Sequence, residues 1–352
     1  MSMFTTLKRA VVRRPQLKRR IKQARYLGLQ ALCHSLGPGI DPRVRILGYH
    51  AVGDGENDLS VSAAEFRRQL EWLMQHGYRL MTMSQWHEAM TTGQPLASRT
   101  VILTFDDGFR SVLTHAAPIL AEYGAATVFV LTDYVGRTNS FDRPFQAPEL
   151  PLLSWDQIER LKRLGWDIQS HGRRHYPMFR LQPSVLEDEA AGSKALLEQR
   201  LGEPVRFLCY PYGAFEPASM ETARRAGYVG AVTCRSGVLP SSRSAVDAKH
   251  DRETGRGMGR QVKSDSNLPS PLAPRSQPRR SEDDWFRLPR SLVDGLMSLG
   301  DFAAMFTPAY LRATALDARW QQWRGRESVC RFESLDTLRH LGVFDEEPAL
   351  AG

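Results

Sequence analysis

Residues 101–108 read VILTFDDG, an apolar run that ends in two adjacent carboxylates and a glycine. The apolar run predicts a buried strand that stops where the carboxylates begin. Asp106 and Asp107 would repel each other unless a positive charge lies between them or one of them holds a proton. A metal ion would resolve this conflict, with one Asp as a ligand and the other free as a base. A tight turn is the alternative, because Asp-Asp-Gly is also common in turns.

A second polar segment follows another strand-like run, GWDIQS at residues 165–170. It contains His171 and His175, and two histidines at this spacing share one face of a helical turn. Neutral imidazole is a common ligand of zinc and related ions, and one Asp with two His leaves positions open for water and substrate. Two unrelated surface histidines are the alternative for this pair by itself. Its combination with a strand-end Asp-Asp-Gly favours a catalytic metal site.

These segments resemble the motifs of the polysaccharide deacetylases, also called the NodB-homology group or carbohydrate esterase family four. The first motif, TFDDG, stands at residues 104–108, and the resemblance implies that Asp106 is the general base and Asp107 a metal ligand. The second motif, H-[ST]-x-x-H, implies His171 and His175 as the other ligands. Gly172 stands where Ser or Thr is usual, which removes a side-chain bond that would steady the loop. Zn²⁺ is the ion we expect, although this ligand set also suits Co²⁺ or Ni²⁺.

Later parts of the chain resemble the remaining motifs less closely. Pro-Tyr-Gly of the third motif is intact at residues 211–213 and implies that the backbone N–H of Tyr212 helps to form an oxyanion hole. The arginine that usually stands two residues before this proline is replaced by Cys209, which leaves the orienting partner of Asp106 open. Arg290, in the sequence Leu-Pro-Arg, resembles the arginine of the fourth motif and is expected to orient the base.

The fifth family motif, a C-terminal strand L-x-L-H, is missing from the end of the chain. A similar run, VRILGYH, stands at residues 44–50 instead. In this respect the chain is similar to an exopolysaccharide N-deacetylase subgroup that begins with a Tyr-His strand and looks circularly permuted. The resemblance implies that His50 is the general acid. A strand-end histidine hydrogen-bonded to backbone is the alternative.

Strand-like and helical segments alternate between residues 44 and 235. Regular alternation predicts a parallel sheet, and about seven units predict an α/β barrel, here a distorted (β/α)7-type barrel of the NodB-homology kind. The candidate residues named so far, Arg290 apart, follow strands, so they are expected at one mouth of the barrel. Helices are expected at 63–76, 84–92, 112–123, 155–164, 183–201 and 217–226, and strands are expected to end at His50, Thr82, Thr104, Leu131, Ser170, Tyr210 and Thr233.

Composition divides the chain into three parts. Residues 1–43 form a basic N-terminal extension, residues 44–300 the barrel, and residues 301–352 a C-terminal helical segment. Residues 241–283 are rich in Ser, Arg, Pro, Gly and Asp and have no aromatic residue, so we expect a disordered insert that interrupts the barrel. Helices are expected at 299–305, 308–324 and 334–341.

The positive charge of the chain lies in its first 40 residues, which hold nine basic side chains and no acidic one. The net charge of the whole chain is +8, so the rest carries 8 minus 9, or −1. A solvated extension is the favoured interpretation. The alternative is peripheral contact with an anionic membrane, where each Lys or Arg contributes about 1 kcal/mol. Nucleic acid is not expected as a partner, because basic and aromatic residues do not interleave in the body.

Targeting signals are weak in this sequence. It shows no clear signal peptide and no run of the ~20 apolar residues that a spanning helix needs. Its four cysteines lack the spacing of a zinc cluster or a disulfide framework. We therefore expect a cytoplasmic protein, with membrane association through residues 1–40 as an alternative. The oligomeric state stays open.

The expected activity is metal-dependent hydrolysis of the acetamide of N-acetylhexosamine units in a polysaccharide or chitooligosaccharide, which yields acetate and a free amine. One alternative is a related amidase that acts on another non-peptide C–N bond, because a fold does not fix a substrate. A non-catalytic glycan-binding protein is the other alternative.

Overall fold

The computed structural model describes residues 39–53, 58–145, 147–239 and 282–323, together with Ala24 and Gly28. Most of the predicted basic extension, nearly all of the predicted insert and the helix expected at 334–341 lie outside the described residues. The predicted division of the chain into three parts therefore stays a prediction.

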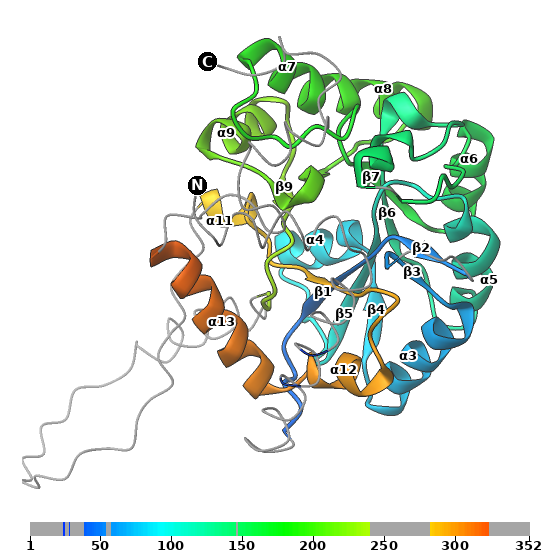
Figure 1. Cartoon of the computed structure of the whole chain (residues 1–352), viewed down its shortest axis with the longest axis vertical. Coiled ribbons are helices and arrows are strands. Elements are labelled where there is room, and N and C mark those ends of the chain that lie inside the picture. Colours follow the sequence, from blue (N-terminus) through cyan, green and yellow to red (C-terminus); the bar gives the residue numbers. More distant parts are fainter. Residues whose placement is uncertain are drawn as a thin grey trace, which may run out of the picture.

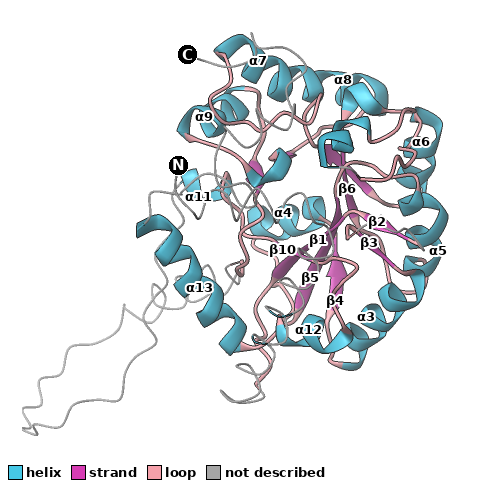
Figure 2. Ribbon diagram, viewed as in Figure 1, coloured by secondary structure: helices cyan, strands magenta, loops and turns pink. Residues whose placement is uncertain are grey.

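Eight parallel strands of the described residues form one sheet around the centre of the molecule (Figure 2). Their order is β10-β1-β5-β6-β7-β8-β9, and β4 pairs with β5 beside this path. A parallel bridge between Val232 of β9 and Leu288 connects the last strand to the segment that leads into β10, which closes the ring. The predicted distorted (β/α)7-type barrel is confirmed. The strands are β1 (Arg45–Tyr49), β4 (Arg79–Met81), β5 (Thr100–Phe105), β6 (Thr127–Val130), β7 (Asp167–Ser170), β8 (Phe207–Cys209), β9 (Gly230–Val232) and β10 (Ser291–Leu292).

One edge of β5 is shared by two strands in succession. The first residues of β5 pair with β4, with Val101 opposite Leu80, and its last residues pair with β6, with Thr104 opposite Thr127. The other edge of β5 pairs along its length with β1. A small parallel pair, β2 (Ala51–Val52) and β3 (Ser60–Val61), lies outside the barrel sheet and was not predicted from the sequence.

Helices surround the strands (Figure 1). The helices expected at 112–123 and 183–201 are present, but each contains a π-helical turn, η1 (Val112–Ala116) and η4 (Asp188–Gly192). Three 3₁₀ turns are η2 (Thr132–Tyr134), η3 (Ser140–Phe145) and η5 (Pro211–Gly213). The α-helices between residues 39 and 323 for which the structure gives bounds are α3 (Ala63–Gln75), α4 (Met83–Thr92), α5 (Ala117–Leu120), α6 (Trp155–Arg163), α7 (Pro183–Glu187), α8 (Ser193–Leu201), α9 (Pro217–Arg225), α11 (Glu282–Trp285), α12 (Leu299–Ala304) and α13 (Pro308–Trp323).

Local sequence explains where these helices begin and end. Thr82 and Gln85 form a capping box at the start of α4, and Gly93 ends that helix in a left-handed conformation. Ser154 and Gln157 form the same box at the start of α6. Because these signals satisfy the end groups of a helix, they position the loops between the strands and the helices.

Buried apolar residues form two clusters, one inside the barrel and one between the sheet and the outer helices. The inner cluster includes Met83 and Trp86 of α4. The backbone N–H of Met83 donates to Thr127 at the start of β6, and that of Ser84 donates to Asp167 at the start of β7. Helix α4 therefore covers the amino end of the barrel, and the carboxyl ends of the strands lie at the opposite mouth.

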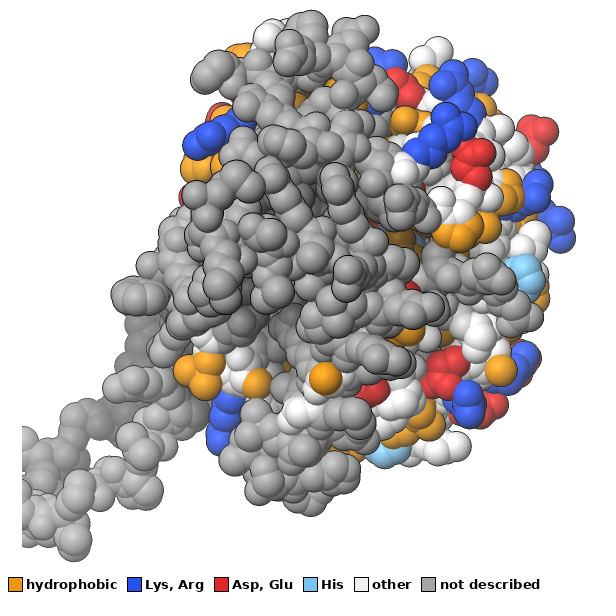
Figure 3. Space-filling model, viewed as in Figure 1, with side chains coloured by type: hydrophobic (Ala, Val, Ile, Leu, Met, Phe, Trp, Pro, Cys, Tyr) orange, Lys and Arg blue, Asp and Glu red, His pale blue; other side chains and the backbone are white. Residues whose placement is uncertain are grey.

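Charges of both signs alternate over the right-hand part of the face seen in Figure 3, with apolar atoms scattered between them. No helix among the described residues is both long and apolar enough to cross a membrane. The predicted location of the protein and the predicted contact of residues 1–40 with a membrane stay predictions.

Candidate active site

The predicted site residues come from five separate places in the barrel. Asp106 and Asp107 follow β5, and His50 follows β1. His171 follows β7, with His175 four residues on, and Tyr212 lies in η5 directly after β8. Arg290 directly precedes β10. The contacts described below connect all seven of these residues in one cluster.

Asp107, His171 and His175 are buried and converge on one point. Oδ1 of Asp107 lies 3.2 Å from Nε2 of His171 and 3.4 Å from Nε2 of His175. Bonds of about 2.0–2.2 Å at tetrahedral angles place neighbouring ligand atoms about 3.3–3.6 Å apart around zinc. The three residues therefore have the spacing of ligands around one small ion.

A hydrogen bond fixes which nitrogen of His171 faces this point. Nδ1 of His171 lies 2.8 Å from the backbone oxygen of Cys209, which can only accept, so Nδ1 carries the proton. Nε2 therefore faces Asp107 Oδ1. Burial alone would lower the pKa of His171, but in the metal-free protein its contacts with Cys209 and Asp107 outweigh burial and raise that pKa well above its usual value, so Nε2 also holds a proton there. A metal ion bound between the two atoms would replace this proton, and an orienting bond on the other ring nitrogen is typical of metal-binding histidines.

The surroundings of His175, in contrast, favour a neutral ring. Burial, partly offset by the charge of Asp107, lowers the pKa of His175 to about 3, so its imidazole is uncharged at neutral pH. The rings of Phe141 and Tyr212 pack against it at centroid distances of 4.4 and 4.3 Å. A neutral ring held by its neighbours meets the requirements for a ligand, so a divalent ion fits this set of donors.

Asp106 points to a different partner. Its two carboxylate oxygens accept from the two terminal nitrogens of Arg290 at 2.5 and 2.7 Å, a two-pronged ion pair in which the arginine is fully buried. Burial alone would raise the pKa of Asp106, but the charges of Arg290 and His171 and the bonds from Arg290 outweigh burial and hold that pKa far below its usual range. Asp106 is therefore a carboxylate at neutral pH, with a fixed orientation.

Arg290 is itself held by the strands around it. It donates to Thr104 Oγ1 at 3.2 Å and to the backbone oxygen of Thr233 at 3.2 Å. A Cβ atom at Gly48 of β1 would lie 3.1 Å from Arg290 Nε and 2.7 Å from Leu292, so only glycine lets the arginine pass beside β1. The expectation that Arg290 contacts Asp106 agrees with this geometry, and its role in the reaction stays a prediction.

Cys209, which replaces the usual arginine of the third motif, contacts the site residues, although no role was predicted for it. Its Sγ lies 3.6 Å from Asp106 Oδ1 and accepts from Arg290 at 3.1 Å. Burial raises the pKa of this thiol to about 11, so it is neutral at neutral pH. The available signal was the position of Cys209 in the third motif, where the resemblance leads one to expect an arginine. Its small side chain leaves space for Arg290, which is distant in the sequence, to reach Asp106.

His50 completes the group beside Asp106. Its Nε2 lies 3.9 Å from Asp106 Oδ2, and its side chain is 13% exposed, whereas that of Asp106 is 4% exposed. His50 is thus the more accessible of the two groups that can transfer protons here. This placement is compatible with the predicted acid role and does not test it.

Unusual backbone conformations gather at this mouth. Five non-glycine residues of the described chain have a positive φ, and three of them are Asp107 (67°), His175 (63°) and Tyr212 (58°). Such conformations cost of order 1–3 kcal/mol each and persist where the surrounding structure imposes them, commonly at functional sites. At Tyr212 the conformation sets the direction of the backbone N–H that we expect to contact an oxyanion.

Comparison with known proteins agrees with this geometry. Residues 93–231 match the family model described as polysaccharide deacetylase. The Bacillus subtilis (strain 168) protein YxkH, whose name assigns it to the same class, is 28% identical over 196 residues, which are 55% of this chain and 66% of that protein. The poly-β-1,6-N-acetyl-D-glucosamine N-deacetylase of Staphylococcus epidermidis is 26% identical over 178 residues, 48% of this chain and 59% of that protein. The chain therefore spans less than two thirds of the length of these two relatives.

A solved structure shares the fold over a larger part of the chain. The deacetylase PplD of Streptococcus pyogenes, in complex with acetate, superposes with a TM-score of 0.56 at 21% identity, covering 76% of this chain and 99% of that one. The match to the family model, the relatives and the shared barrel agree with the motifs in the sequence. Over residues 93–231 the chain is similar to the polysaccharide deacetylase family, and it shares the fold of a solved deacetylase.

Proposed function

We propose that this protein is a metal-dependent N-deacetylase that hydrolyses the acetamide of N-acetylhexosamine units in a polysaccharide. The observation that carries the proposal is the convergence of Asp107, His171 and His175 beside an ionised Asp106 that Arg290 holds in place. A ligand set and an adjacent, separately oriented carboxylate are what hydrolysis of an amide by an activated water requires. The name of the Staphylococcus epidermidis relative supports an N-acetylglucosamine polymer as the substrate class.

We propose Zn²⁺ as the ion that Asp107, His171 and His175 hold. One carboxylate and two neutral imidazoles suit zinc, and they also accept Co²⁺ or Ni²⁺. When bound, such an ion supplies Lewis acidity to the acetamide carbonyl and to the attacking water.

The remaining chemistry belongs to the protein's own groups. Asp106 accepts the proton of the attacking water, because it is ionised and points its oxygens in a fixed direction. The backbone N–H of Tyr212 donates to the oxyanion that forms as water adds. His50 then protonates the nitrogen that leaves, because an amine is a poor leaving group without a proton. The products are acetate and a glucosamine unit.

Acetate release tests this proposal directly. The full chain is stripped of metal with a chelator, reloaded with Zn²⁺, and incubated with N-acetylglucosamine oligomers in β-1,6 and β-1,4 linkage and with peptidoglycan fragments. We expect acetate in at least one of these reactions only after reloading. Metal binding without acetate from any glycan, combined with release from a non-sugar amide, would favour the alternative amidase. The absence of both metal binding and acetate release would favour a glycan-binding protein.

A further inference from the structure

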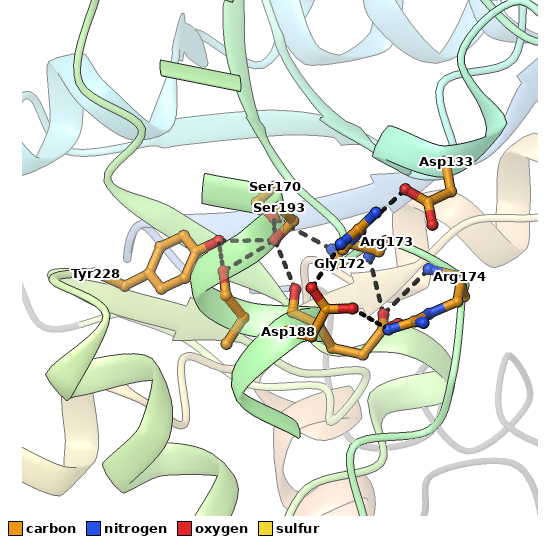
Figure 4. A network of polar contacts seen from close by, with 10 residues as sticks. Asp133, Ser170, Gly172, Arg173, Arg174, Asp188, Ser193 and Tyr228 are labelled. Carbon is orange, nitrogen blue, oxygen red and sulfur yellow. Dashed lines mark hydrogen bonds and ion pairs between the residues drawn. The ribbon is translucent and has the colours of Figure 1, made fainter. Parts of the chain in front are cut away.

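The loop that carries the two histidines is held by a buried carboxylate outside the ligand set. Glu189 lies in the π-helical turn η4, and its side chain is fully buried. Oε2 of Glu189 accepts from the backbone N–H groups of Arg173 at 2.8 Å and Arg174 at 3.1 Å. Oε1 accepts from Nε of Arg174 at 2.7 Å. Figure 4 shows the polar contacts around Arg173 and Arg174 of the loop and Asp188 of η4.

Two successive backbone N–H groups that point at one anion form a small anion-binding concavity. Here the concavity lies between His171 and His175, and the anion is the side chain of Glu189. The carbonyl oxygens of the same loop face the other way, where Gly172 accepts from Thr132 N and Arg173 accepts from Asp133 N at 3.2 Å each. The loop is therefore clamped between η2 on one side and η4 on the other.

Gly172 makes the approach of Glu189 possible. Its φ is +86°, and a Cβ atom there would lie 2.9 Å from Glu189 Oε2 and 3.1 Å from Met178 Cε. Any side chain at this position would therefore push the carboxylate away from the loop. The glycine and the glutamate form a matched pair, although they are 17 positions apart in the sequence.

The π-helical turn is anchored in its own right. Ser193 Oγ donates to the carbonyl of Glu189 at 2.6 Å and contacts Ser170 Oγ at 2.8 Å. Ser170 is the last residue of β7, and its Oγ accepts from Gly172 N at 3.1 Å. Tyr228 reaches the same turn by donating to the carbonyl of Ala190 at 3.0 Å (Figure 4). The end of β7 and the turn that presents Glu189 are thus tied to each other.

We propose that Glu189 is a positioning residue, which sets the affinity for metal by fixing the loop from His171 to His175. This inference rests on the proposed metal site, and it adds a determinant that neither the ligand motif nor the family motifs contain. Each histidine must bring one nitrogen to the same point, so a loop with greater freedom loses affinity even when all three ligands remain. Removing a group that orients ligands typically costs about 10–100-fold in metal affinity.

Asp188 offers a matched control one residue away in the same turn. Its carboxylate accepts from the side chains of Arg173, at 2.5 Å, and of Arg174, and its hydrogen bonds within the described residues do not involve a backbone N–H of the loop. Its side chain is 38% exposed, so its ion pairs are of the partly exposed kind that contribute little. Asp188→Ala therefore removes a negative charge beside the same two arginines and leaves the bonds from the backbone N–H groups to Glu189 in place.

The test measures the dissociation constant for Zn²⁺ by competition with a chromophoric chelator, on the full metal-stripped chain and its variants. Circular dichroism and thermal unfolding of the metal-free proteins check the fold. We expect Glu189→Ala to bind Zn²⁺ about 10–100-fold more weakly than the parent. Asp188→Ala should differ by less than about threefold. Glu189→Gln should recover most of the lost affinity, because one amide oxygen can still accept both backbone N–H groups.

Equal affinity in Glu189→Ala and the parent would overturn the inference, and so would an equal loss in Asp188→Ala. If Glu189→Ala does not fold, Gly172→Ala decides, because its Cβ would displace the same carboxylate; parental affinity in that variant would overturn the inference. Failure of the parent protein to bind Zn²⁺ would instead contradict the proposed metal site itself, so the two failures are distinguishable.

Discussion

The two halves of the candidate site are built in different ways. The ligand half, which comprises Asp107, His171 and His175, comes from the ends of β5 and β7, and both of these strands pair with β6. The proton half, which comprises Asp106, His50 and Arg290, combines the end of β5 with residues next to β1 and β10. Arg290 is 184 positions from Asp106 in the sequence. One half is local within the sheet, and the other exists only after the barrel has closed.

This difference explains why one half is easier to recognise. Short motifs encode a ligand half, because each motif is a strand end and the two strands flank a common neighbour. The proton half depends on the pairing of β10 with β1, where Leu47 lies opposite Ser291. Gly48 then leaves room for Arg290 to reach Asp106. The partner of the base is therefore set by topology and close packing rather than by a nearby motif.

The largest effect is expected in the ligand half. His175→Ala removes one of three protein ligands, so purified protein should lose bound metal and all measurable acetate release. Metal content by mass spectrometry and acetate release check this. His115→Ala, an exposed histidine on η1, is the control and should retain both. Full metal occupancy in His175→Ala would show that His175 is not a metal ligand.

A large loss of folding stability is expected when Arg290 of the proton half is replaced by an uncharged residue. Arg290→Met leaves the carboxylate of Asp106 buried without its partner, which typically costs about 3–5 kcal/mol of folding free energy. Denaturant unfolding of the metal-free protein measures this loss. Arg287→Met, an exposed arginine of the same segment, should change the free energy of unfolding far less. Similar stabilities for the two variants would contradict a structural ion pair at Asp106.

Sequence patterns predicted the barrel because strands and helices alternate with clear periodicity and helix caps. The two π-helical turns were missed, because an apolar pattern at helical spacing does not distinguish a helix with one widened turn from a regular one. The pair β2 and β3 was missed because strands of two residues carry almost no periodic signal.

The candidate residues of the site were all named from motifs and a family resemblance, and the structure brings them together. What the sequence could not provide is the network behind them. Glu189 looks like a surface acid in a helical segment, and only the packing of η4 against the histidine loop makes it a buried acceptor. Cys209 likewise looks like an ordinary strand residue until Arg290 occupies the space beside it.

A smaller, substrate-dependent effect is expected for His50. His50→Ala should retain metal but slow the cleavage of N-acetylglucosamine oligomers, by up to the 10²–10⁴-fold that is typical of acid–base help. An aryl acetate ester with a good leaving group needs little protonation, so its hydrolysis should hardly change. Parallel rate measurements on both substrates check this. Equal losses would make His50 a structural residue and leave the general acid to be found elsewhere at the mouth.

The smallest effect concerns stability in acid. The pKa of Asp106 is lower in the folded state than its usual value of 3.8, because Arg290 outweighs the effect of burial. Its contribution to folding is therefore complete above about pH 4 and is lost as the pH falls through the folded pKa. The unfolding temperature of the metal-free parent should therefore fall more steeply between about pH 5 and pH 2 than that of Asp106→Asn. Parallel curves for the two proteins would contradict the lowered pKa.

The two adjacent aspartates test the division of the site most directly. Asp106→Asn and Asp107→Asn are isosteric changes at neighbouring positions, one in each half. Metal content and acetate release are measured on the same preparations. We expect Asp107→Asn to lose both metal and activity, and Asp106→Asn to keep its metal while losing about 10²–10⁴-fold in rate. Loss of metal from Asp106→Asn, with metal retained in Asp107→Asn, would contradict the assignment of ligand and base.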